Sequence, residues 1–324
     1  MIKKLITFIL ICCSFSVFAQ SVSPQSGETL LYFTKNAGED IGVKDSNGNI
    51  IIPAEFLNYS GTEDGTVVED TLLSFVGCPK NIKQEPHTFG YVFNRKGEYL
   101  YQTFWYDNGA DYRVEGYQRI VKNGKVGFAN REGEIVIQPQ FDFASPFNYG
   151  YASVCDGCYW KKAGEDHKTV VGGKWGFINK KGEKVAPLSK PTQEKDVKIH
   201  ENYYPYPFNY SEKEQKILNV FQQKMKLLAD IYYVNVYSLA KPKVLHFEIV
   251  ERPSKYFPFY LVYSYDNRKI PTDGEFLVSQ DGKSIFAVAY SGKKIPFAEW
   301  LQKQIQAARE YQQKHSDNPN KFIE

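Results

Sequence analysis

The sequence predicts a mainly β N-terminal repeat domain, built from tandem antiparallel hairpins, followed by a small C-terminal α+β domain. Four tight turns of one kind, each with Asn or Asp first and Gly fourth, occur between residues 38 and 186. Tyr and Phe are abundant, at 24 and 23 of 324 residues, which suits half-buried β hairpins. Beyond residue 210 the pattern changes to a helix, several strands with period two and a final helix, an order typical of an α+β domain.

Residues 1–19 have the features of a secretory signal peptide. Two lysines precede an apolar run, and Val17-Phe18-Ala19 provides a small-residue cleavage site. The run is too short to anchor the chain in a bilayer, and no second run of membrane length follows. Lipid attachment through Cys12 or Cys13 is the alternative, which we disfavour because Ile11 stands where a small residue is expected. We therefore predict export to the periplasm or outside the cell, with no transmembrane segment in the mature chain.

Residues 125–154 contain the most complete copy of the repeat. Two β-favouring runs flank the turn at residues 130–133, in which Asn130 caps a type I turn and Gly133 adopts a positive φ. This arrangement is typical of a three-residue hairpin loop with a Gly bulge. Another glycine lies in the strand before each turn, where it indicates either close approach of a neighbouring backbone or a bulge, and both remain open. The residues that define the four copies are Gly42, Gly48, Gly90, Gly97, Gly127, Gly133, Trp175, Gly176 and Gly182.

This pattern resembles the WG-repeat (KWG) family of bacterial β repeats. Residues 125–154 carry the whole pattern, including Pro139 and Asp142, and Trp175-Gly176 supplies the dipeptide of the family name. The resemblance covers residues 38–186 and implies stacked hairpins with an extended binding surface, but no activity. The in-strand glycines are unevenly spaced, at 48, 37 and 49 residues, so we do not expect a regular closed propeller.

Composition divides the mature chain into four parts. Residues 20–190 are expected to form the WG-type β-repeat domain, and residues 191–210, which mix Pro, Tyr and charge without periodicity, are expected to form a linker. Residues 211–310 are expected to form the α+β domain, which opens with a capping box and a helix predicted to run to about residue 230. A second helix is predicted to begin near residue 296. Residues 311–324 are predicted to be a polar tail that frays at its end.

Cys155 and Cys158 are a candidate disulfide. They enclose Asp-Gly, which predicts a turn, and disulfides form in exported proteins. Zinc binding by Cys155, Cys158 and His167 is a weaker alternative because the fourth ligand would lie far away in the chain, and free thiols are a third possibility. In the disulfide case, Cys78 is the unpaired cysteine of the mature chain.

The sequence contains no recognised catalytic or cofactor-binding motif. It has no G-x-S-x-G elbow, no H-E-x-x-H helix and no nucleotide-binding glycine loop. A net charge of +3 does not indicate a nucleic acid partner. We therefore predict no catalytic residue, no cofactor, and a partner that is a protein or another envelope component, with an unrecognised hydrolase as the enzymatic alternative.

The leading hypothesis for function is a non-catalytic binding scaffold formed by the repeats. The alternative places ligand binding or inhibitory activity in the C-terminal α+β domain, with the repeats as a display spacer. A deep pocket lined by Tyr260, Tyr263 and Tyr290 would favour the alternative, whereas a filled core at these residues would count against it.

Overall fold

The computed structural model describes residues 29–77, 79–106, 109–163, 168–236, 242–289 and 291–322. The predicted signal peptide, Cys78, His167 and Tyr290 lie outside these residues. The described residues form 21 strands and three helices. All the strand pairs among them are antiparallel. The predicted fold class is confirmed.

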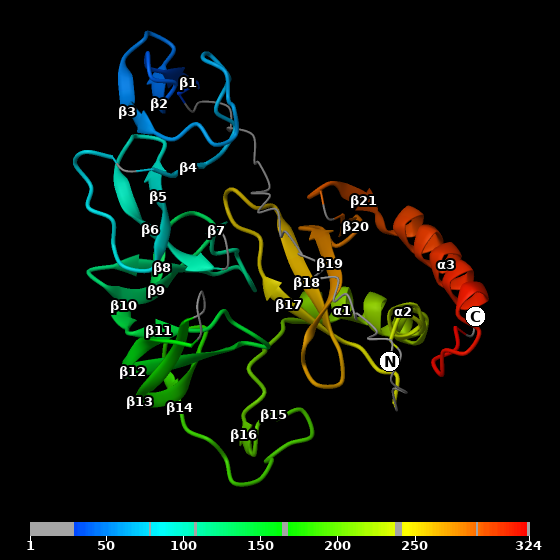
Figure 1. The fold of residues 1–324 in the computed structure, drawn as a ribbon. Coiled ribbons are helices and arrows are strands. Elements are labelled where there is room, and N and C mark those ends of the chain that lie inside the picture. The colour runs from blue at the N-terminus through cyan, green and yellow to red at the C-terminus, as the bar shows by residue number, and fades with distance from the viewer. Residues whose placement is uncertain are drawn as a thin grey trace, which may run out of the picture.

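The repeats form a column of three successive sheets, with the α+β part alongside it (Figure 1). The first sheet contains β1 (Leu31–Lys35), β2 (Ile41–Asp45) and β3 (Ile50–Phe56). The second contains β4 (Leu72–Phe75), β5 (Thr88–Asn94), β6 (Tyr99–Tyr106), β7 (Gly109–Ala110), β8 (Gln118–Lys122), β9 (Lys125–Ala129) and β10 (Ile135–Phe141). The third contains β11 (Phe143–Ala144), β12 (Tyr151–Lys162), β13 (Lys168–Asn179) and β14 (Lys184–Val185). The column is therefore an open series of sheets.

The four repeat turns share one hydrogen-bond pattern. The backbone N–H of the fourth residue donates to the carbonyl of the first, and the first side chain accepts from the N–H that follows the turn. The fourth residue has φ between 80° and 85° in all four turns, a conformation that favours glycine. Three of these turn glycines, Gly97, Gly133 and Gly182, also pack against the preceding repeat, whereas a Cβ at Gly48 would meet no atom within 4 Å. A Cβ at Gly97 would lie 2.5 Å from the carbonyl oxygen of Ile51, and one at Gly182 would lie 3.1 Å from Cγ2 of Ile137.

The in-strand glycines fall into two groups. A Cβ at Gly127 would lie 2.5 Å from the carbonyl oxygen of Ile137, and the β9–β10 register shifts at this point. Gly42 makes the same kind of contact with Ile52, beside a shift in the β2–β3 register. Close approach and a bulge thus occur together, because the bulge pushes the partner backbone across the glycine. A Cβ at Gly176 would have no atom within 4 Å, so neither explanation applies there.

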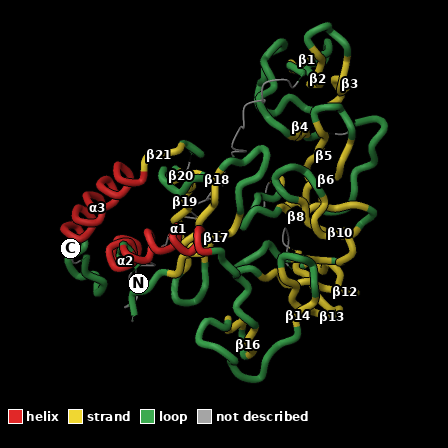
Figure 2. The backbone as a smooth tube through the Cα atoms, turned by 180° about the vertical axis from the view of Figure 1, so that it is seen from behind, coloured by secondary structure: helices red, strands yellow, loops and turns green. Residues whose placement is uncertain are grey.

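The C-terminal part is a five-stranded sheet with its helices on one face. The sheet lies between these helices and the repeat column in both views (Figure 2). The predicted capping box forms between Ser211 and Glu214. The first predicted helix is divided at Lys224, whose N–H donates to the carbonyl of Phe221, three residues earlier, and so tightens the helix. The elements are α1 (Glu212–Gln223), α2 (Met225–Tyr233), β17 (His246–Glu251), β18 (Phe259–Tyr265), β19 (Pro271–Ser279), β20 (Ile285–Val288), β21 (Lys294–Pro296) and α3 (Phe297–Lys314).

The predicted polar tail, residues 311–324, is partly helical and packs on the domain in its described part, residues 311–322. Helix α3 continues to Lys314, and the chain then folds back onto the domain. The side chain of Asn318 donates to the carbonyl of Val234 at 2.8 Å, just after α2. Phe322 is buried among the apolar side chains of the helices and the sheet. The polar composition of this segment does not indicate its packing, because the side-chain amides of Asn318 and Asn320 donate to backbone carbonyls just after α2.

The other face of the C-terminal sheet is also covered. One apolar cluster combines Tyr149 and Tyr151 of the repeats with Leu261 and Tyr265 of β18. Residues 191–210, expected as a linker, contain the hairpin β15 (Val197–Ile199) and β16 (Asn202–Tyr204), and Tyr204 belongs to the same cluster. The repeats, the hairpin and the α+β part therefore share a core.

Candidate functional site

A surface patch of aromatic side chains joins the second, third and fourth repeats. The ring of Trp160 stacks on His87 at 4.7 Å, and Phe143 lies 5.8 Å from both Trp160 and Trp175. We call these four residues the aromatic patch. Trp175 is 49% exposed.

A second half-exposed tryptophan lies in the second repeat. The ring of Trp105 contacts Phe89 at 5.5 Å and is 46% exposed. The backbone N–H of Trp105 donates to the carbonyl of His87, which places the two residues on neighbouring segments. Trp300, the fourth tryptophan of the chain, packs instead against the core of the α+β part. Trp105 and Trp175 are thus the two half-exposed tryptophans of the described repeats.

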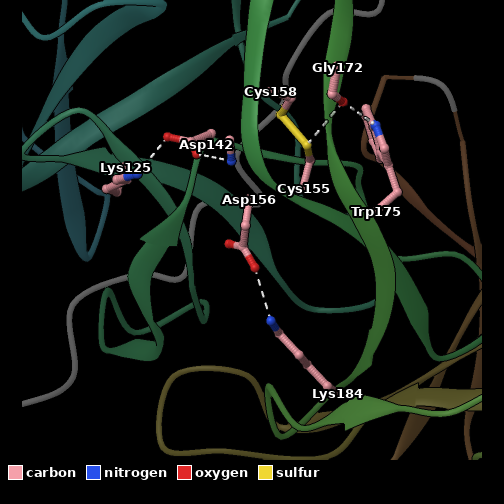
Figure 3. Close-up of a disulfide and its surroundings, with 9 residues drawn as sticks. Lys125, Asp142, Cys155, Asp156, Cys158, Gly172, Trp175 and Lys184 are labelled. Atoms are coloured by element: carbon pink, nitrogen blue, oxygen red, sulfur yellow. Dashed lines mark hydrogen bonds and ion pairs between the residues drawn. A yellow bond between two sulfur atoms is a disulfide. The ribbon is translucent and has the colours of Figure 1, made fainter.

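A local distortion of β12 at Gly157, which leaves the β12–β13 register unchanged, turns Trp160 toward the patch. The structure joins Cys155 and Cys158 as a disulfide within this strand (Figure 3), so the turn expected around Asp-Gly is absent. In a regular strand these two side chains would point to opposite faces. Gly157 has φ of 79°, which breaks the alternation and puts Cys155, Cys158 and Trp160 on one side. Disulfide formation itself stays a prediction for mass spectrometry.

Contacts from Gly173 and Asp142 accommodate the distortion of β12 at Gly157. A Cβ at Gly173, in β13, would lie 2.5 Å from Sγ of Cys155, so only glycine fits opposite the disulfide. Oδ2 of Asp142 accepts from the N–H of Gly157 at 2.6 Å, while its Oδ1 lies 2.5 Å from Nζ of Lys125 (Figure 3). The Lys125 ammonium lowers the pKa of Asp142 and keeps it a good acceptor.

The zinc alternative gains no support from the described residues. Among them, no three His, Cys, Asp or Glu side chains form a group that could hold a metal ion. His167, the third suggested ligand, and Cys78 lie outside the described residues.

Two repeat turns carry cations that dock on β17 of the α+β part. Arg131, second in its turn, forms two 2.8 Å hydrogen bonds with the carboxylate of Glu251. Lys180, second in the next turn, donates to the carbonyls of Glu115 and Val250 at 2.5 and 2.6 Å. Burial lowers the pKa of Lys180. These contacts fix the repeats to the C-terminal sheet.

Two buried carboxylates complete this junction. Glu248 accepts hydrogen bonds from the hydroxyls of Tyr149, Tyr206 and Tyr210 at 2.6 to 2.7 Å. Glu115 accepts from the hydroxyl of Tyr265 at 2.6 Å and from the N–H of Gly150 at 2.9 Å. Burial, reinforced by Glu248, raises the pKa of the three tyrosines that it binds. Each hydroxyl thus remains a hydrogen-bond donor. Both carboxylates accept their hydrogen bonds from groups of the protein itself.

The region named in the C-terminal alternative is a filled core in its described part. Tyr263 belongs to the apolar cluster under the repeats, whereas Tyr260 packs against the helix side of the sheet. The two residues therefore do not line one pocket. His246, at the start of β17, is half-buried, and burial lowers its pKa to about 4.

The family comparison agrees with this geometry. The family model described as WG containing repeat matches residues 127–160 and 175–188. These two segments are similar to WG repeats. The match includes the distorted part of β12, Trp175 and the third and fourth turns, whereas the first two copies lie outside it but form the same turn. No curated protein and no solved structure shows significant similarity to this chain. No described helix is long and apolar enough to cross a bilayer.

Sequence reasoning missed the junction because it assigned a role only to the first and fourth turn positions. A pattern was available, since Arg95, Arg131 and Lys180 all occupy the second turn position. All three are engaged, Arg95 by the carbonyls of Val68 and Asp70. A repeated cation at one turn position therefore predicted a shared docking role.

Proposed function

We propose that this chain is an exported, non-catalytic scaffold that binds a protein or another envelope component through the aromatic patch and Trp105. The observation that carries the proposal is the half-exposed Trp175 within an aromatic patch built by three repeats, with a second half-exposed tryptophan, Trp105, in the second repeat. Tryptophan is enriched among residues that dominate binding, because it offers a large apolar area with few rotatable bonds. Export rests on the predicted signal peptide.

Rigidity supports the same function. The carboxylate of Asp142 holds the distorted backbone of β12 at Gly157, and the indole N–H of Trp175 donates to the carbonyl of Gly172 at 2.8 Å. A side chain that is already ordered loses less entropy when a partner binds. The binding surface is therefore preorganised.

The test uses the full mature chain as bait for an envelope extract. Trp105→Ser and Trp175→Ser, singly and together, are compared with Tyr59→Ser, which changes a tyrosine that is 88% exposed in the loop after β3. We expect the double variant to lose the partner that the wild type and Tyr59→Ser retain, with unchanged melting temperature. Retention of the partner by the double variant would contradict the proposal.

A further inference from the structure

A cavity lies where the third and fourth repeats, the β15–β16 hairpin and the β18–β19 turn meet. Its volume is about 240 Å³, smaller than the roughly 300–1,000 Å³ of sites for drug-sized ligands. Tyr149, Tyr151 and Phe177 from the repeats form an aromatic wall. This wall and volume suit a molecule about the size of one sugar ring.

The charged side chains that line this cavity are basic. Lys198 and His200 come from the hairpin, and Arg268 and Lys269 come from the β18–β19 turn. No carboxylate occurs among the described lining residues. Three acids lie close to these residues: Asp266 pairs with Arg268 at 2.8 Å, Glu201 lies 3.9 Å from Lys198, and Glu248 accepts a hydrogen bond from Tyr149 at 2.6 Å. The ammonium of Lys269 lies 5.0 Å from the ring of Tyr149.

Lys269 occupies a position that the fold elsewhere gives to glycine. The turn at residues 266–269 repeats the pattern of the repeat turns, since the N–H of Lys269 donates to the carbonyl of Asp266 and Oδ1 of Asp266 accepts from Ile270. Gly182 and Gly282 fill the equivalent position in two other turns, with φ of 80° and 76°. Lys269 has φ of 61°, in the region that side chains disfavour. The local geometry would be better satisfied by glycine.

The same unfavourable conformation recurs around this cavity. Seven non-glycine residues in the described part of the chain have positive φ, and three of them, Tyr149, His200 and Lys269, line it. Such conformations persist where the surrounding structure imposes them, and they cluster at functional sites. Burial also lowers the pKa of Lys269 to about 8, and a nearby anion would raise it again by favouring the charged ammonium.

We propose that this cavity binds a small organic anion, a carboxylate- or phosphate-bearing molecule of monosaccharide size, with Lys269, Arg268 and Lys198 around the anionic group and Tyr149 beside the ring. The site is separate from the aromatic patch, so it does not depend on the scaffold proposal.

Titration calorimetry of the full mature chain tests this with three probes: glucuronate, glucose 6-phosphate and glucose. We expect at least one anionic probe to bind and glucose to bind more weakly. If glucuronate binds more tightly than glucose 6-phosphate, the ligand is a carboxylate; the reverse order indicates a phosphate. Lys269→Gly should weaken the anion about tenfold, the effect of losing one charged hydrogen bond. Its melting temperature should stay the same or rise, because glycine suits this φ.

Two further variants keep the outcome decisive. Arg268→Ala should also weaken the anion, whereas Lys181→Gly, which removes an exposed turn lysine elsewhere, should not. Anion binding no tighter than that of glucose would overturn the proposal. So would full affinity in both Lys269→Gly and Arg268→Ala.

Discussion

The junction and the aromatic patch are both built by the repeats, but they differ in how completely their side chains are satisfied. At the junction, Arg131 and Lys180 reach β17, and Glu248 accepts from three tyrosine hydroxyls inside a shared core. At the patch, Trp175 keeps half of its surface exposed. The same repeat thus makes a permanent internal contact and an open surface. We expect substitutions at the junction to cost stability and substitutions at the patch to cost binding.

The largest expected effect is at Glu248. Glu248→Ala should reduce the free energy of unfolding by about 3–5 kcal/mol, because it leaves three buried hydroxyls without their acceptor. Urea unfolding measures this loss. Glu248→Gln keeps an acceptor oxygen and should lose less, and equal losses in the two variants would contradict the hydrogen-bond explanation.

A matched pair of glycines should separate the packed and open parts of the repeats. Gly127→Ala should lose about 1–3 kcal/mol, because its Cβ would meet the β10 backbone. Gly176→Ala, beside Trp175, should change stability by no more than about 0.5 kcal/mol, because the space there is empty. Thermal melting of both variants checks this, and equal destabilisation would show that the strand position itself matters.

These two glycines also show how far sequence could go. The hairpins and their turns followed from residues close in the chain, such as Asn130 and Gly133, whose contacts are local. The close approach at Gly127 depends on a bulge in the partner strand, and the junction depends on residues more than 100 positions apart, such as Arg131 and Glu251. The patch requires the distortion of β12 at Gly157, which turns Trp160 toward it. The sequence had predicted a turn at this Asp-Gly pair, not a continuous strand. The separate domain boundary at residues 191–210 stays a prediction.

The smallest expected effect is a pH dependence at Lys269. Burial lowers its pKa to about 8, and it faces Glu248, Asp266, His246 and Tyr149. Between that value and the ordinary lysine pKa of about 10.4, the unfolded chain binds more protons, so stability should rise with pH. The urea midpoint of the wild type, minus that of Lys269→Gly, should therefore increase as the pH rises from about 8 to 9.5. Parallel profiles would contradict the lowered pKa.

Site-specific photocrosslinking in the full mature chain tests the central claim most directly. A photoreactive residue replaces Trp175, Trp105 or, as a control on the exposed side of α3, Gln306. We predict that positions 175 and 105 crosslink the same envelope partner and that position 306 does not. A partner crosslinked from position 306 alone would contradict the account and place binding on the C-terminal part.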